Sequence, residues 1–508
     1  MHALGLATWF RRRAERDGSR DAISFAGQTL TFAQAQAEIE AFADMLAASG
    51  VEPGDRVAYV GFNHSRFLIA LFATARLGAI FVPLNFRCTG HELAYFVRDS
   101  GAQLLIADEV HSGPVDEVRT DLDVRTYLRF GEGAEGWQGI EELLARAHPH
   151  VQEAPVDPES PGVIVYTSGT TGNPKGAVLS HRNLWTNNIN WMLSVGYGSD
   201  HVALTSAPLF HSGGMCVMTL PMLMAGAHVI IHEKFDPGLL LDDVERYRVT
   251  SLFLVPAMMQ GISRHERFDS ADLSSIRIVV AGAAPVPESL LRLYGSRGIP
   301  VSQCWGQTEV ATGATFLGTE EALDKLGSCG TAGLLNEVRL VDFSGEPITE
   351  PGVRGELCVR GDTVTPGYWN LPEATAAAQG GDGWFRTGDV AYQDEDGYFY
   401  IVDRLKDMII SGGENVYSAE VEDAIYGHPA VAEVAVIGAA DERWGERVVA
   451  VVALKDGEEL DLESLREFAG ARLARYKLPL ELRLVDELPR NTTGKILKHE
   501  LRAESTSA

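Results

Sequence analysis

The chain has 508 residues, of which 45% are hydrophobic and 22% are charged, so it is long enough for two or more globular domains. Its formal net charge of -27 excludes the basic face expected of a nucleic-acid-binding protein and disfavours electrostatic docking to anionic lipids. An anionic substrate would therefore have to be captured by a local positive site within a negative surface.

The N-terminus, the cysteines and the apolar stretches favour a cytoplasmic protein. Residues 1–18 lack the apolar h-region of a secretory signal. The five cysteines lie far apart and never form a CxxC pair, so they suggest neither a disulfide framework nor a zinc site. The longest apolar stretch, residues 215–231, is too short to span a bilayer and contains Pro221 and His228. We expect a buried helix and strand there.

Helical stretches alternate with short β-branched runs along most of the chain. This alternation predicts an α/β fold, with parallel-rich sheets covered by helices and with ligands bound at the turns after the strands. The stretches, in chain order, are RVAYVGF (56–62), SRFLIALFATARLGA (65–79), LLIAD (104–108), HVIIHE (228–233), LDDVERYRVT (241–250), SLFLVP (251–256) and SIRIVVAG (275–282).

The pattern changes near residue 400. A hairpin with its turn at residues 394–397 is followed by the charged connector DRLKD, residues 403–407, and then by a glycine turn, a helix and a strand. The rest of the chain predicts a small α+β unit of about 100 residues, which is large enough to fold by itself. We therefore predict a large N-terminal domain, residues 1–403, and a small C-terminal domain, residues 404–508.

Residues 167–176, TSGTTGNPKG, form a glycine-rich loop directly after the apolar run GVIVY. The loop is not a P-loop of the Walker type, because Pro174 and not the second glycine precedes Lys175. Its hydroxyl and backbone N–H groups are nevertheless suited to wrapping phosphate oxygens, and its lysine can balance their charge. A surface loop without a ligand is the alternative interpretation.

Nine motifs together resemble the acyl-CoA synthetase branch of the adenylate-forming superfamily, in that family's order and spacing, from about residue 8 to residue 503. The superfamily also includes amino-acid adenylation domains and luciferases. The motifs are YTSGTTGNPKGAVLSH (166–181), APLFHSGG (207–214), AGAAPVP (281–287), WGQTE (305–309), GELCVRG (355–361), GYWN (367–370), WFRTGD (384–389), DRLKDMIISGGENVY (403–417) and LPRNTTGKILK (488–498).

The resemblance implies a large adenylate-forming domain, a small mobile C-terminal domain and a ligase reaction in two steps. A small carboxylic acid and Mg-ATP give an acyl-adenylate and pyrophosphate, and the thiol of coenzyme A then displaces AMP. ATP, Mg²⁺ and coenzyme A are the implied cofactors and co-substrates. Such chemistry depends on positioning and on charge neutralisation, which fits a loop rich in hydroxyls and glycine.

The same resemblance assigns an ATP site with residues from both predicted domains. Residues 167–175 would hold the pyrophosphate, Gly282 to Ala284 would line the adenine, and Asp389 would accept from the ribose hydroxyls. The full ATP-binding set is Thr167, Ser168, Gly169, Thr170, Thr171, Gly172, Lys175, Gly282, Ala283, Ala284, Trp305, Gly306, Gln307, Thr308, Asp389, Ile401, Arg404 and Lys495.

Four residues are predicted at the reacting groups. Glu309 would bind Mg²⁺, and Thr308 would lie near the α-phosphate. Lys495 would bridge the carboxylate and the phosphate during adenylation. His211 is predicted as a gate or wall beside the substrate carboxylate and not as a general base.

The small domain is predicted to rotate about Lys406 between the two steps, which would remove Lys495 and bring a glycine turn to the active site. The predicted coenzyme A residues are Gly412, Gly413, Trp444, Tyr476 and Lys477.

The acyl pocket is predicted to accept an aliphatic or aryl acid of modest size. Amino-acid adenylation domains have an aspartate after the phenylalanine that corresponds to Phe210, and here His211 follows it. Without that carboxylate a substrate ammonium would be buried without a partner, so α-amino acids are disfavoured. The predicted pocket residues are Trp191, His211, Ser212, Gly213, Met215, Cys304, Ala311 and Thr312.

Several alternatives stay open at the level of the sequence. The acyl group could pass to a carrier protein, an amine or another acceptor in a secondary-metabolite pathway. A non-catalytic nucleotide-binding regulator is a second alternative, although the presence of Glu309, Asp389 and Lys495 argues against it. The identity of the acid and the formation of a homodimer are also undecided.

Overall fold

The computed structural model describes residues 4–146, 151–167, 174–412, 414–441, 443–490 and 496–505, with residues 503–505 described without their side chains. The chain divides into two compact units, one formed by Met1–Val338 with Cys358–Arg386 and the other by Arg339–Leu357 with Thr387–Ala508. This division reflects how densely the segments pack within each unit. The predicted boundary between residues 403 and 404 instead marks the point about which the small domain is predicted to rotate. The boundary therefore stays a prediction.

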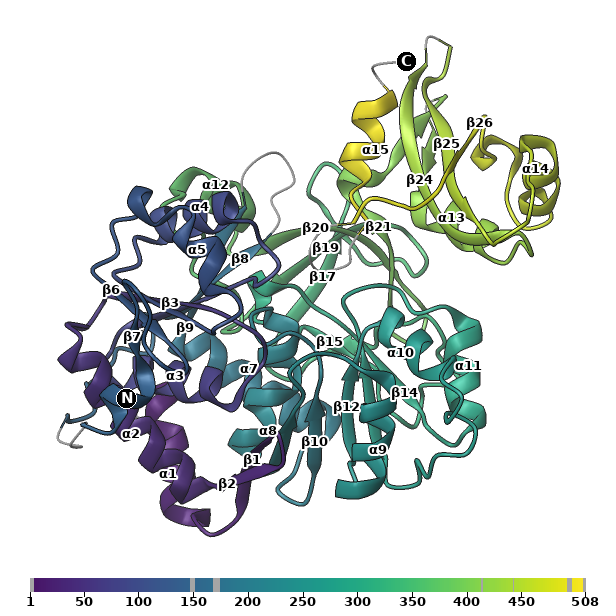
Figure 1. Ribbon diagram of the computed structural model, residues 1–508. Coiled ribbons are helices and arrows are strands. Elements are labelled where there is room, and N and C mark those ends of the chain that lie inside the picture. Colours follow the sequence, from purple (N-terminus) through teal and green to yellow (C-terminus); the bar gives the residue numbers. More distant parts are fainter. Residues whose placement is uncertain are drawn as a thin grey trace. The chain divides into compact units, whose positions relative to one another are not determined.

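One sheet of the first unit has seven strands in the order β7-β6-β5-β3-β4-β8-β9 (Figure 1). Its neighbouring strands are parallel except for β8 and β9, which form an antiparallel pair. Strands β4 and β5 are buried along their whole length, as expected for parallel strands covered on both faces. The strands are β3 (Arg56–Val60), β4 (Ile80–Leu84), β5 (Leu104–Ala107), β6 (Thr126–Arg129), β7 (Gln138–Gly139), β8 (Pro161–Thr167) and β9 (Lys175–Ser180).

The second sheet of this unit has nine strands in the order β16-β15-β14-β13-β12-β10-β11-β1-β2. Its six central strands are parallel, and the strands at both edges are antiparallel. The strands are β1 (Asp21–Phe25), β2 (Gln28–Thr31), β10 (Val202–Thr205), β11 (His228–Ile231), β12 (Ser251–Leu254), β13 (Ile278–Ala281), β14 (Val301–Trp305), β15 (Thr315–Phe316) and β16 (Thr331–Ala332).

Helices pack against both sheets, and the largest hydrophobic core joins side chains of α1, α2, α3, α7 and α8 with side chains of the strands (Figure 1). Capping boxes start α2, α4 and α7 by satisfying backbone N–H groups of the first turn. The helices of this unit are α1 (Leu6–Asp17), α2 (Phe32–Ala48), α3 (Ser65–Arg76), α4 (Gly90–Ser100), α5 (Ser112–Asp116), α6 (Ile140–Leu144), α7 (His181–Val195), α8 (Leu220–Ala225), α9 (Pro237–Tyr247), α10 (Pro256–Ser263), α11 (Glu288–Ser296) and α12 (Pro372–Gln379).

The apolar stretch of residues 215–231 forms a buried π-helical turn (Gly213–Thr219), helix α8 and strand β11. This agrees with the expected helix and strand. Within the described part of the chain, no helix combines the length and the apolar character needed to cross a membrane.

The second unit contains a sheet in the order β18-β17-β19-β20-β21 and another in the order β23-β22-β25-β24, in which β26 pairs with β25. The predicted turn at residues 394–397 joins β20 to β21, and Asp394 N donates to the Tyr398 carbonyl across it at 2.9 Å. The predicted α/β class with an additional α+β part is confirmed. The elements are β17 (Glu337–Val341), β18 (Pro347–Ile348), β19 (Gly355–Arg360), β20 (Phe385–Gln393), β21 (Phe399–Arg404), β22 (Ile409–Ser411), β23 (Glu414–Val416), β24 (Val431–Asp441), β25 (Gly445–Leu454), β26 (Glu481–Val485), α13 (Ser418–Tyr426), α14 (Leu462–Gly470) and α15 (Lys498–Ser505).

Candidate active site

The glycine-rich loop connects the antiparallel strands β8 and β9. Thr167 at the end of β8 pairs with Lys175 at the start of β9, and the Thr167 hydroxyl donates to the Lys175 carbonyl at 3.3 Å. Both ends of the loop are therefore held at one place. The predicted phosphate-binding residues between them, Ser168, Gly169, Thr170, Thr171 and Gly172, lie outside the described residues.

Tyr368 connects the predicted pyrophosphate-binding lysine with the predicted Mg²⁺-binding glutamate. Its hydroxyl donates to Glu309 Oε1 at 2.9 Å, and the ammonium of Lys175 lies 5.0 Å from the centroid of its ring. Glu309 is only 8% exposed, so this hydrogen bond orients a buried carboxylate. The structure thus brings both residues to Tyr368, with Lys175 over its ring and Glu309 at its hydroxyl.

The segment that carries Tyr368 is anchored next to both of these residues. Thr365 N donates to the Glu309 carbonyl at 2.7 Å, and Trp369 N donates to the Gly176 carbonyl at 2.7 Å. The sequence motif GYWN contains Tyr368, but the sequence analysis assigned this tyrosine no role. The presence of the motif was the only signal that could have identified it.

Thr308 contacts the predicted acyl pocket. The hydroxyls of Thr308 and Ser212 are 2.7 Å apart and buried. His211 Nδ1 accepts a hydrogen bond from Gly213 N at 3.0 Å, and burial lowers the pKa of His211. A neutral imidazole whose Nδ1 accepts carries its proton on Nε2, so this ring offers a donor to the site and no basic nitrogen. That state fits the predicted role of His211 as a wall beside the substrate carboxylate and disfavours a role as a general base.

The backbone around the predicted adenine wall and the WGQTE turn is strained. Ala283, Ala311 and Thr312 have positive φ angles of 68°, 53° and 88°. Such conformations are costly for residues with a Cβ and concentrate at functional sites. Gly306 is required in this turn, because a Cβ there would overlap the carbonyl oxygen of Thr312. Gln307 closes the turn by accepting from Thr312 N at 3.0 Å.

The adenine wall and the acyl pocket meet where two parallel strands end. Gly282 follows β13, and Cys304 and Trp305 end the neighbouring β14. A Cβ on Gly282 would lie 3.0 Å from Cys304 Sγ, so a larger residue there would push against the thiol. Ala284 follows in the same turn. Ligands of open α/β sheets bind at this carboxyl edge.

The indole of Trp191, one of the predicted pocket residues, packs against two further aromatic rings. Its ring contacts Phe316 edge to face at 4.7 Å and stacks on Tyr197 at 6.1 Å. Trp191, Met215 and Ala311 belong to one buried cluster, and Cys304 packs against it. The sequence analysis missed Tyr197, which follows the end of α7 in an irregular segment without any motif.

In the second unit, Asp389 and Arg404 face each other across β20 and β21 and form an ion pair at 2.6 Å. The side chain of Asp389 is 4% exposed. The predicted nucleotide residue Ile401 lies on the same strand as Arg404, opposite Ala391. The hairpin therefore brings Asp389 and Arg404 together, with Ile401 three residues before Arg404 on the same strand.

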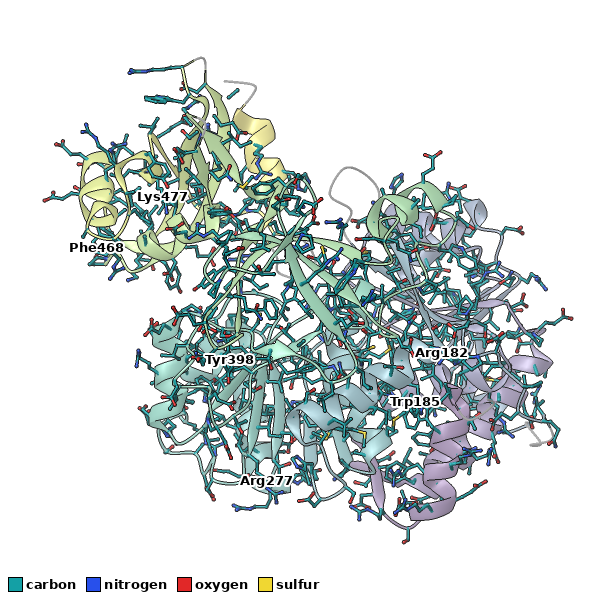
Figure 2. All side chains as sticks on the ribbon, turned by 180° about the vertical axis from the view of Figure 1, so that it is seen from behind. Arg182, Trp185, Arg277, Tyr398, Phe468 and Lys477 are labelled. Atoms are coloured by element: carbon teal, nitrogen blue, oxygen red, sulfur yellow. The ribbon has the colours of Figure 1, made fainter. Side chains whose placement is uncertain are left out.

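Two of the predicted coenzyme A residues contact each other. Gly412 N donates to the Trp444 carbonyl at 2.7 Å, and a Cβ on Gly412 would lie 3.0 Å from the Trp444 ring. Trp444 and Tyr476 are exposed, whereas Lys477 is paired with Glu420. Figure 2 shows Lys477 in the same C-terminal part of the chain as Phe468, which belongs to α14. Gly413 lies outside the described residues.

Lys406 lies in a single 3₁₀ turn (Leu405–Asp407) between β21 and β22. Burial lowers the pKa of Lys406, and the neighbouring Asp407 accepts from Arg502 of α15 at 2.7 Å. Asp403 on the other side accepts from the Ser418 hydroxyl at the start of α13 at 2.8 Å. The catalytic lysine predicted from the sequence, Lys495, lies outside the described residues.

Two parallel-rich sheets with candidate nucleotide-binding residues at their strand ends define a nucleotide-dependent enzyme of the α/β class. The family model described as "AMP-binding enzyme" matches residues 10–369, and the model "AMP-binding enzyme C-terminal domain" matches residues 420–495. The chain belongs to the AMP-binding enzyme family, in the acyl-CoA synthetase branch of the adenylate-forming superfamily.

The similar curated proteins include several CoA ligases. A feruloyl-CoA synthase from Amycolatopsis sp. is 45% identical over 502 residues, which cover 99% of both chains. An indoleacetate–CoA ligase from Aromatoleum aromaticum is 42% identical over 500 residues, 98% of both chains. The predicted ligase class, acid:CoA ligase, is thereby confirmed.

Solved structures of the same fold include two ligand complexes. The o-succinylbenzoate CoA synthetase of Bacillus subtilis in complex with its acyl-adenylate intermediate matches with a TM-score of 0.88, 32% identity and 97% of both chains covered. ATP-bound MatB from Rhodopseudomonas palustris matches with a TM-score of 0.90, 31% identity and 98% of both chains covered. ATP thus fits the family to which this chain belongs.

Proposed function

We propose that the protein activates an aryl carboxylic acid with ATP and transfers the acyl group to coenzyme A. The observation that carries this proposal is the contact of Tyr368 with both Lys175 and Glu309, beside the hydrogen-bonded pair of Thr308 and Ser212. These contacts bring together a cation and a carboxylate, and join a hydroxyl to Ser212, a residue of the predicted acyl pocket. Adenylation needs these groups in that neighbourhood.

In the adenylation step, Lys175 and the glycine-rich loop bind the leaving pyrophosphate, and Thr308 donates to the phosphate that is attacked. The Glu309 carboxylate is a hard oxygen ligand suited to Mg²⁺, which typically takes one or two protein carboxylates together with phosphate oxygens. Bound Mg²⁺ would neutralise charge on the phosphates.

The proposed nucleotide contacts are those predicted from the sequence. Gly282, Ala283, Ala284 and Trp305 contact the adenine, while Asp389 accepts from the ribose. The ion pair of Asp389 with Arg404 supports this role, because the guanidinium orients the carboxylate.

The acid lies against Trp191, Met215 and Cys304 with its carboxylate toward His211. No acidic side chain belongs to the predicted pocket set, and His211 is neutral, so a substrate ammonium would have no partner. The names of the feruloyl and indoleacetate ligases, which share 45% and 42% identity, favour an aryl acid over a purely aliphatic one.

Thioester formation uses a second arrangement of the same chain. The small domain, residues 404–508, rotates about Lys406, which withdraws Lys495 and presents Gly412, Gly413 and Trp444 to the thiol. Lys477 is paired with Glu420 in the present arrangement and binds coenzyme A after that pair opens.

A panel of acids with Mg-ATP, assayed for pyrophosphate release with and without coenzyme A, tests the proposal. We expect aryl acids to stimulate release, free α-amino acids to give no stimulation, and acyl-CoA to form only with coenzyme A. A proteinogenic amino acid among the best substrates would contradict the pocket assignment.

The acceptor is tested by the same assay. A fatty acid–[acyl-carrier-protein] ligase from Streptomyces coeruleorubidus is 35% identical to this chain, so a phosphopantetheinylated carrier protein is the appropriate competing acceptor. Product formation with the carrier protein and none with coenzyme A would replace the proposed acceptor and leave the adenylation step intact.

A further inference from the structure

Three buried polar atoms without a hydrogen-bond partner belong to described residues in or beside the predicted acyl pocket. Among the described residues, Trp191 Nε1, the Tyr197 hydroxyl and the Thr312 hydroxyl are buried and have no hydrogen-bond partner. Buried polar groups are nearly always paired, so three unpaired ones near each other indicate a missing partner. The indole N–H can only donate, and the two hydroxyls can donate or accept.

These groups are held close together by packing. Tyr197 follows helix α7, on which Figure 2 labels Arg182 and Trp185, and its ring is nearly parallel to that of Trp191, at 7° and 6.1 Å. A Cβ on Gly313, the residue after Thr312, would lie 2.7 Å from Trp191 Nε1. Only a glycine at position 313 therefore allows the backbone next to Thr312 to lie this close to the indole N–H.

We propose that this end of the pocket recognises an oxygen substituent on the ring of an aryl acid, and that Tyr197 determines this specificity. The inference rests on the proposed function. A hydroxyl or methoxyl oxygen on the ring accepts from the Tyr197 hydroxyl, with the Trp191 N–H and the Thr312 hydroxyl as additional donors. An acid without this oxygen leaves all three groups unpaired, and sites built to bind a hydroxyl reject analogues that lack it.

The pKa of Tyr197 is raised by burial and by the nearby Cys304, so its hydroxyl keeps its proton at neutral pH. Cys304 belongs to the predicted acyl pocket, and burial raises the pKa of its thiol to about 12. A protonated phenol and a neutral thiol together favour a neutral ring substituent over a charged one.

The test compares cinnamic acid with 4-hydroxycinnamic and 4-hydroxy-3-methoxycinnamic acids in the pyrophosphate-release assay. For the wild type we expect kcat/KM to be higher for the oxygenated acids by about tenfold or more. Tyr197→Phe keeps the ring and removes only the hydroxyl, so it should reduce this preference by about tenfold, chiefly by lowering kcat/KM for the oxygenated acids.

Tyr59→Phe is the matched control. The hydroxyl of Tyr59 is also buried and also lacks a partner among the described residues, but Tyr59 lies on β3 of the seven-stranded sheet and packs against Phe67 and Phe81. Its removal should not change the preference. Thermal unfolding of both variants checks that they are folded.

The outcomes separate the two proposals. Equal use of cinnamic and oxygenated acids by the wild type, or an equal loss for all acids in Tyr197→Phe, would overturn the specificity role and keep the ligase function. If none of the acids tested stimulated pyrophosphate release by the wild-type protein, the proposed function would be overturned, and this inference with it.

Discussion

Tyr368 shows how a single hydroxyl can organise a charged site. Glu309 is buried, and a buried carboxylate is stable as an anion only when donors compensate for its lost hydration. The Tyr368 hydroxyl supplies one such donor at 2.9 Å and leaves the second carboxylate oxygen for a further ligand. Tyr368 is therefore a positioning residue for the proposed Mg²⁺ ligand.

We predict that Glu309→Gln lowers kcat for pyrophosphate release by about 100-fold, because an amide cannot replace the negative charge at this position. Tyr368→Phe should cause a smaller loss of about tenfold, since the carboxylate is kept and only its orientation weakens. Raising the Mg²⁺ concentration should partly restore Tyr368→Phe and not Glu309→Gln.

Glu337→Gln is the control for this pair, because Glu337 forms an exposed ion pair with Arg360 outside the proposed site. It should retain wild-type kcat. Wild-type kcat in Glu309→Gln would remove Glu309 from the proposed metal site.

His64 is a second residue whose environment predicts a measurable effect. Its Nδ1 accepts from Arg66 N at 3.0 Å and so caps helix α3. Burial, together with the charge of Arg66, lowers the pKa of His64 from 6.5 to about 4. Below pH 6.5 the unfolded state therefore binds a proton that the folded state takes up only near pH 4, and stability falls as the pH falls through this interval.

We predict that His64→Asn reduces this pH dependence and preserves the cap, because asparagine is a preferred residue at this position of a helix. Between pH 7.5 and pH 5 the free energy of unfolding should fall by about 2 kcal/mol less in the variant than in the wild type. Urea unfolding at both pH values measures the difference. An equal fall in both proteins would show that His64 titrates normally.

At the scale of elements, the turn Leu405–Asp407 joins the β20–β21 hairpin to the C-terminal sheet. Asp407, in this turn, accepts a hydrogen bond from Arg502 of α15. Asp403, just before the turn, accepts one from Ser418 of α13. A rotation about Lys406 would therefore have to break the contact of Asp403 with Ser418, whereas Asp407 and Arg502 both belong to the proposed small domain and would move together. Glu420 on α13 adds a further connection, because it pairs with Arg354 and with Lys477.

We predict that Lys406→Pro forms acyl-AMP at a rate within about threefold of the wild type but transfers it to coenzyme A about 100-fold more slowly. Proline fixes φ and also restricts the preceding Leu405, so the turn loses the freedom to adopt a second conformation. The two half-reactions are measured separately, with chemically prepared acyl-AMP for the second.

Lys406→Ala serves as the control, since it removes the charge and keeps the backbone freedom. It should affect neither half-reaction strongly. Unimpaired thioester formation by the proline variant would mean that the rotation is centred elsewhere, and the proposed boundary at residues 403–404 would have to move.

At the scale of the whole molecule, the proposed function uses one active site for two reactions. A different part of the small domain would face that site in each reaction. We predict that Lys495→Ala lowers acyl-AMP formation by at least about 100-fold and leaves thioester formation from supplied acyl-AMP close to wild type. The reason is that Lys495 serves the first step only. An equal loss in both half-reactions would contradict two arrangements and would indicate one fixed site.

Much of this protein followed from the sequence by itself. Alternating helical and β-branched runs predicted the parallel-rich α/β sheets, and the family motifs, read in order, predicted the ligase class. These inferences succeeded because each depends on a short stretch of chain, whose periodicity, glycines or hydroxyls carry their meaning locally. The replacement of an aspartate by His211 is information of the same local kind.

The tertiary structure alone decided which distant residues meet. Tyr368 lies 59 positions from Glu309 along the chain, and nothing in its own neighbourhood indicates their hydrogen bond. Tyr197 has no motif, and its unpaired hydroxyl becomes visible only after the aromatic cluster around Trp191 is packed. Such contacts are set by the packing of whole strands and helices against one another. This packing buries polar atoms, and the complete fold decides which of them find a hydrogen-bond partner.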